Sequence, residues 1–175
     1  MSKINNASEL VAKIKQFEGQ KKIDLSSGED LSIAIMSLIS LEEHFYFTAQ
    51  KTGKHGYYNW LDKVREIRKE MLKKLVNEPE GEVWCISKHL LASSMRLIEV
   101  GTKELHNKKA NEAEKIFNRA YELYNLFWGL NLKVVPLGEV KKIDQTALDK
   151  NDKNKFPIWR KLGSVIQKVL DCCRE

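Results

Sequence analysis

The chain has 175 residues, of which 42% are hydrophobic and 31% are charged, with only 9 glycines and 3 prolines. This composition excludes a disordered or fibrous chain and is typical of a helix-rich globular protein of about one domain. No apolar run approaches the roughly 20 residues of a membrane-spanning helix, and the polar start of the chain has no signal-peptide core. We therefore expect a cytoplasmic protein with no membrane partner.

The net charge of +6 is unevenly distributed along the chain. Residues 29–130 hold 15 basic and 15 acidic side chains, whereas residues 1–28 carry a charge of +2 and residues 131–175 a charge of +4. The body of the chain therefore has no overall charge that would attract phosphate. Weak nucleic-acid binding through the basic flanks stays open as one alternative.

The three cysteines do not form the spacing pattern of a disulfide framework. Cys85 lies within a helical pattern, and Cys172 and Cys173 are adjacent to one another. This usage fits a reducing compartment and agrees with the cytoplasmic expectation.

The first predicted helix runs from Ser8, a suitable N-cap, to Gly19, a suitable stop, with Phe17 on its apolar face. A second, long helix is expected over residues 31–49, because Ser27 and Asp30 resemble a capping box. This second helix is apolar nearly all round, which is typical of a helix that is contacted on several sides. The sequence TGKHG at residues 52–56 is expected to end it.

The third predicted helix begins at Asn59 and has the clearest amphipathic pattern in the chain. Its stripe includes Trp60 and Arg68, and Pro79 and Gly81 break the pattern before the next helix. Five large side chains are expected to be mostly buried at the common core, because each lies on the apolar stripe of its helix: Trp60, Leu90, Leu97, Phe117 and Tyr124.

A central antiparallel helical hairpin is predicted over residues 84–128, with its turn near residues 106–109. Within it, Gly101, Ala113, Phe117 and Ala120 are spaced like the small and aromatic positions of one tetratricopeptide unit. This partial resemblance implies two closely packed helices. No second copy of the pattern occurs in the sequence, so the resemblance does not imply a repeat protein.

After residue 132 the pattern becomes polar and aperiodic, and Pro157 then suits the first turn of a last amphipathic helix. We therefore divide the chain into a helical bundle at 1–132 and a connector with a C-terminal helix at 133–175. The predicted fold class is all-α, a helical bundle built on the central hairpin. The C-terminal helix is expected to pack on the bundle or on a partner.

One polar stripe on the first helix of the hairpin is the best candidate for chemistry. Cys85, His89 and Arg96 share one face, and His44 on the long helix could approach them. A cysteine and a histidine four residues apart suit a soft metal such as zinc, but zinc needs four convergent ligands. We therefore keep His44, Cys85, His89 and Arg96 as candidate ligand-binding residues and expect neither a bound metal nor a cofactor.

No catalytic motif is present in the sequence, whereas aromatic residues are too plentiful for one core to enclose. The leading hypothesis is therefore a non-enzymatic helical adaptor or scaffold that binds another protein or itself. A metal- or small-ligand-binding bundle is the alternative, followed by weak nucleic-acid binding.

Overall fold

A computed structural model describes residues 7–76 and 81–135, and within these ranges the chain forms five helices and no strand. The all-α prediction is confirmed for this part of the chain. The predicted connector and C-terminal helix lie outside the described residues, and the division at residue 133 stays a prediction. The helices are α1 (Ala7–Lys21), α2 (Leu25–Thr52), α3 (Gly56–Lys73), α4 (Glu82–His106) and α5 (Ala110–Asn131).

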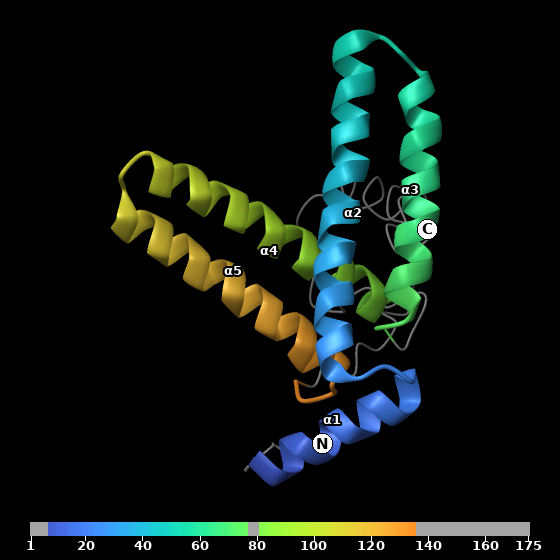
Figure 1. Cartoon of the computed structure of the whole chain (residues 1–175), viewed down its shortest axis with the longest axis vertical. Helices are drawn as coiled ribbons and strands as arrows, with labels where there is room; N and C mark the ends of the chain where they lie inside the picture. The colour runs from blue at the N-terminus through green and yellow to red at the C-terminus, as the bar shows by residue number, and fades with distance from the viewer. Residues whose placement is uncertain (1–6, 77–80, 136–175) are drawn as a thin grey trace, which may run out of the picture.

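Two antiparallel hairpins make up most of the fold (Figure 1). One consists of α2 and α3, the other is the predicted central hairpin of α4 and α5, and α2 crosses α4. Beyond this crossing the two hairpins diverge as separate arms, and α1 lies across the base (Figure 1). The central hairpin is therefore one of two comparable units.

The hydrophobic core lies at the base, where the ends of all five helices meet (Figure 1). Each helix supplies apolar side chains to it because the amphipathic stripes converge only here. Beyond the base, each arm is only two helices thick and can enclose fewer side chains. The most enclosed members of the core include Phe17, Ile35, Leu72, Leu75, Trp84, Leu91 and Phe127.

The first two helices have different ends from those predicted. Asp24, and not Ser27, is the N-cap of α2, because the Asp24 carboxylate accepts a hydrogen bond of 2.9 Å from the Ser27 backbone N–H. The bonds from Ser27 also lower the pKa of Asp24. Helix α1 continues past Gly19 to Lys21, whose Nζ donates to the Val76 carbonyl oxygen at 2.7 Å.

Small side chains set the spacing between α4 and α5. A Cβ atom on Gly101 would lie only 2.6 Å from the Phe117 ring, and Ala113 and Ala120 are almost completely buried. The Ser94 hydroxyl donates to the Ala120 carbonyl oxygen at 2.8 Å. The close approach predicted from the spacing of these small residues is therefore confirmed.

The predicted buried residues have different outcomes. Leu90 is buried, and Leu97, Phe117 and Tyr124 are half-buried. The prediction for Trp60 is wrong, because 57% of its surface is exposed. The apolar stripe of α3 is wider than the surface that α2 covers, and Trp60 lies on its uncovered edge.

Candidate functional site

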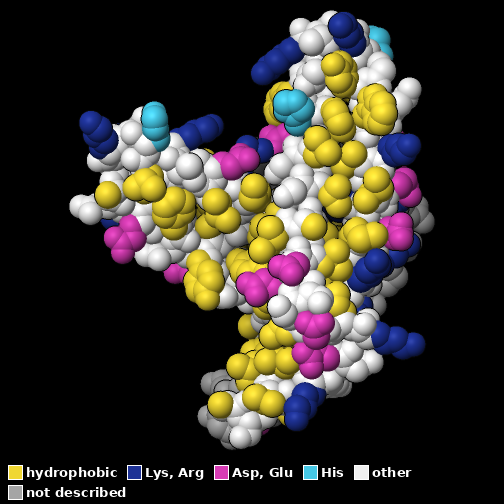
Figure 2. Space-filling view, viewed as in Figure 1, with side chains coloured by type: hydrophobic (Ala, Val, Ile, Leu, Met, Phe, Trp, Pro, Cys, Tyr) yellow, Lys and Arg dark blue, Asp and Glu magenta, His cyan; other side chains and the backbone are white. Residues whose placement is uncertain are grey.

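A mostly apolar and partly exposed surface runs along one side of the α2/α3 arm. Its side chains recur at alternating steps of three and four residues on both helices. Figure 2 shows hydrophobic side chains gathered over both helices on this side. We call this set the α2/α3 seam, and it consists of Ala34, Leu38, Leu41, Phe45 and Thr48 on α2 and Tyr57, Trp60, Val64, Ile67 and Met71 on α3. Four of these residues are exposed, namely Ala34, Leu41, Trp60 and Ile67, whereas Val64 is buried and the others are half-buried.

Three large side chains of the seam are strongly exposed. Leu41 is 38% exposed, Ile67 43% and Trp60 57%. The alternation of three- and four-residue steps is the pattern by which a helix packs lengthwise against another helix. Helix α4 packs against the opposite side of α2, so this pattern does not serve the contact between the two hairpins. Part of the seam serves the contact between α2 and α3 themselves, as the stacked rings of Phe45 and Tyr57 show, whereas Leu41, Trp60 and Ile67 are left exposed by the described fold.

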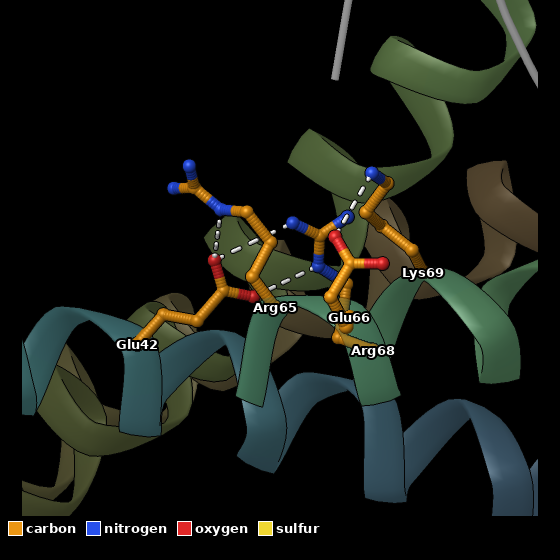
Figure 3. A network of polar contacts seen from close by, with 5 residues as sticks. All are labelled: Glu42, Arg65, Glu66, Arg68 and Lys69. Atoms are coloured by element: carbon orange, nitrogen blue, oxygen red, sulfur yellow. Dashed lines mark hydrogen bonds and ion pairs between the residues drawn. The ribbon is translucent and has the colours of Figure 1, made fainter. Parts of the chain in front are cut away.

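A buried ionic network joins α2 to α3 beside the seam (Figure 3). The Glu42 carboxylate accepts hydrogen bonds from the Nε atoms of Arg68 at 2.9 Å and Arg65 at 3.0 Å. Arg68 is only 1% exposed, and Arg65 reaches the same carboxylate from the surface. A charge this deeply buried is tolerated only with a partner, and we infer that the network favours one alignment of the two helices.

This alignment places Leu41 and Ile67 at the same level of the arm. Leu41 directly precedes Glu42 in α2. Ile67 lies in α3 between Arg65 and Arg68, the two arginines that bind Glu42. The phenyl ring of Phe45 also stacks on Tyr57, with 6.2 Å between the ring centroids. The seam is consequently presented by two helices whose relative positions are fixed.

Sequence analysis did not identify this network, although a signal was present. Arg68 lies within the apolar stripe of α3, and Glu42 lies on a helix that is apolar nearly all round. A charged side chain in an apolar stripe is rarely buried alone. The two residues could have been paired on that ground.

Among the predicted ligand-binding residues, Arg96 has a clear structural role. Its guanidinium donates to the carboxylates of Glu99, on its own helix, and Glu43, on α2. The pairing with Glu99 lies within α4, and the pairing with Glu43 joins the two hairpins at their crossing. Arg96 is thus engaged in a surface ion-pair network.

The other three predicted residues lie in different settings. Cys85 is buried in the core, whereas His44 and His89 are exposed. His44 follows Glu43, so its side chain is rotated about 100° away from the side of α2 that meets Arg96. Within residues 7–76 and 81–135, no three His, Cys, Asp or Glu side chains are grouped so that they could hold a metal ion.

A pocket at the far end of α4 offers little for a ligand. Its lining comes from one helix end and the turn after it, at Thr102, Lys103, His106 and Asn107. Enclosed ligand sites usually draw their walls from several elements. The α2/α3 seam is therefore the more informative surface.

Comparison with known protein families, curated proteins and solved structures found no match to this chain. Across the described residues, no helix has the length and hydropathy that crossing a membrane requires.

Proposed function

We propose that this chain is a non-enzymatic protein-binding module whose docking surface is the α2/α3 seam. The observation that carries the proposal is the exposure of Leu41, Trp60 and Ile67 on one helix-packing surface. Contiguous apolar patches on soluble proteins commonly mark sites of protein contact. The partner expected from the spacing is helical, because three- and four-residue steps on both helices match helices laid lengthwise.

The composition of the seam supports protein binding. Aromatic side chains and methionine are enriched in protein interfaces, and tryptophan is frequent among the residues that dominate binding energy. Trp60 is the most exposed large side chain of the seam, and Met71 lies farther along the same helix. Full enclosure of a large apolar side chain contributes about 1.5–3 kcal/mol. Covering Leu41, Trp60 and Ile67 together would therefore provide a substantial driving force.

The rigidity of the α2/α3 arm also supports the proposal. The Glu42 network and the stacked rings of Phe45 and Tyr57 hold the two helices in one alignment before any partner arrives. A surface that is already ordered loses less conformational entropy on binding. The alternative of a metal- or small-ligand site gains no comparable support from the positions of His44, Cys85 and His89.

The proposal can be tested by capturing partners from an extract of the source cells. Bait protein carrying Ile67→Glu should lose a partner that the wild type retains, because a carboxylate placed in the seam opposes its desolvation. Tyr121→Glu is the matched control, since Tyr121 is an exposed aromatic residue on α5, outside the seam. Circular dichroism should show all three proteins equally helical.

Two outcomes would contradict the proposal. Equal capture by the wild type and Ile67→Glu would show that the seam is not the docking surface. If only Tyr121→Glu loses the partner, the docking surface lies on α5 and not on the seam.

A further inference from the structure

We infer that the partner of the α2/α3 seam is a second copy of this chain, docked antiparallel about a two-fold axis level with Leu41 and Ile67. This inference rests on the proposed function and adds the identity of the partner. Two seams packed in this way form a four-helix bundle, in which α2 lies against α2 and α3 against α3 of the second copy. The charges along both edges of the seam carry the argument.

The edge along α3 is complementary to itself. Lys63 and Glu70 are exposed, carry opposite charges and lie on the same side of α3 beside Ile67. Their midpoint falls between Glu66 and Ile67. A two-fold axis at this level brings Lys63 of each copy next to Glu70 of the other, which forms two equivalent ion pairs.

The edge along α2 repeats the same arrangement independently. Asp30 and Lys51 are exposed and oppositely charged, and their midpoint falls between Ser40 and Leu41. The Glu42 network places Leu41 level with Ile67, so both edges define the same axis. A partner of unrelated sequence would have no reason to require charges that are symmetric about one level.

The apolar contacts agree with this axis. At the axis, Leu41 of one copy contacts Leu41 of the other, and Ile67 contacts Ile67. These two residues are the exposed apolar side chains of the seam at that level. Trp60 of each copy lies over the end of α3 in the other copy, near the Met71 thioether and the Lys74 ammonium group. A thioether and an ammonium group are both favourable neighbours for an indole ring.

The central residue provides the first test, by sedimentation equilibrium of the full chain. The wild type should be a dimer, and Ile67→Glu should be a monomer, because the two carboxylates would face one another at the axis. A wild type that stays monomeric up to high concentration would overturn the inference. It would do so equally if the reason were that residues 157–170 of the same chain cover the seam. Capture of another protein through the seam would in that case still support the proposed function.

The edge charges provide the second test, at low ionic strength. Lys63→Glu and Glu70→Lys should each weaken dimerisation by roughly tenfold or more, since each change places like charges together at two sites. The double variant should return to within roughly threefold of the wild type. Lys115→Glu, an exposed change on α5, is the control and should leave the dimer unchanged.

The double variant decides the register of the dimer. Failure of the double variant to recover would overturn the proposed axis. Persistence of the dimer in Ile67→Glu would show that a different surface forms it and would equally overturn the inference.

Discussion

The two hairpins are similar in length but are held together by different means. Between α4 and α5, Gly101 and Ala120 allow the backbones to approach closely, and Ser94 bonds across the gap. Between α2 and α3, the buried Glu42 binds two arginines. The α4/α5 hairpin is aligned by the shapes of its side chains, and the α2/α3 hairpin is aligned by charge.

Both arms expose large apolar side chains. On α4 and α5 these are Ile98, Val100, Leu105, Tyr121 and Leu126, while other large side chains of the two helices are enclosed in the base. The Glu42 network occupies interior positions of the α2/α3 arm, and Leu41, Trp60 and Ile67 lie at the uncovered side. We infer that charge fixes the alignment of α2 and α3, so that their apolar side chains remain available for a partner.

The strongest test of this comparison is removal of one member of the buried network. Arg68→Met should lower the free energy of unfolding by about 3–5 kcal/mol, because the Glu42 carboxylate would lose its most buried partner. Urea denaturation measures the change. The double variant Glu42→Leu with Arg68→Met should regain most of the loss. A double variant less stable than Arg68→Met alone would contradict the assigned role.

The corresponding test of the α4/α5 hairpin adds a single methyl group. Gly101→Ala should lower the free energy of unfolding by about 1–3 kcal/mol, because its Cβ atom would collide with the Phe117 ring. Gly19→Ala in α1 is the control, since a Cβ atom there meets nothing within 4 Å. That control should be stabilising by about 0.5–1 kcal/mol. Equal effects of the two changes would show that the hairpin spacing does not depend on Gly101.

Two tryptophans allow the base and the seam to be compared, because Trp84 lies in the base and Trp60 lies in the seam. Trp60→Ala should change the free energy of unfolding of a dissociated, monomeric Ile67→Glu background by less than about 1 kcal/mol, because its ring is mostly in solvent. Trp84→Ala in the same background should cost about 3–5 kcal/mol, because that ring is 1% exposed in the core. Similar losses in thermal or urea unfolding would place Trp60 in the core after all.

The smallest expected effect concerns the beginning of the α2/α3 hairpin. The bonds from Ser27 lower the pKa of Asp24 in the folded chain, so its carboxylate favours folding at pH values above the ordinary carboxyl pKa. This contribution is lost as the pH falls through the lowered pKa. Urea midpoints measured between about pH 5 and about pH 2 should therefore fall less steeply for Asp24→Asn than for the wild type. Parallel slopes would contradict this role of Asp24.

The sequence predicted the helices and the central hairpin because periodicity, caps and small-residue spacing are local signals. The spacing of Gly101 and Ala120, for example, was sufficient to predict the close approach of the two helices of that hairpin. The position of Trp60 could not be predicted, because periodicity identifies a stripe but does not show how much of that stripe a neighbouring helix covers. The choice of Asp24 over Ser27 as the N-cap depended on backbone geometry at a single turn.

The candidate site was predicted less well than the fold. A surplus of aromatic side chains was evident, and Tyr46 and Tyr121 are indeed exposed. The location of the seam required the rotation of α2 and α3 relative to α4, which no local pattern contains. Cys85 and His89 lie on the same helix, but they differ in burial. Cys85 is enclosed on the side of α4 that faces the base, whereas His89 is exposed.

Radical footprinting of side chains in the full-length protein tests the central claim most directly, because it reports the solvent exposure of Trp60 itself. Tyr121 serves as an internal reference, since it is exposed and lies outside the seam. The account predicts that Trp60 and Ile67 become protected relative to Tyr121 as the protein is concentrated or placed in cell extract. Reactivity of Trp60 that stays constant relative to Tyr121 under both conditions would contradict the claim that the α2/α3 seam binds a protein.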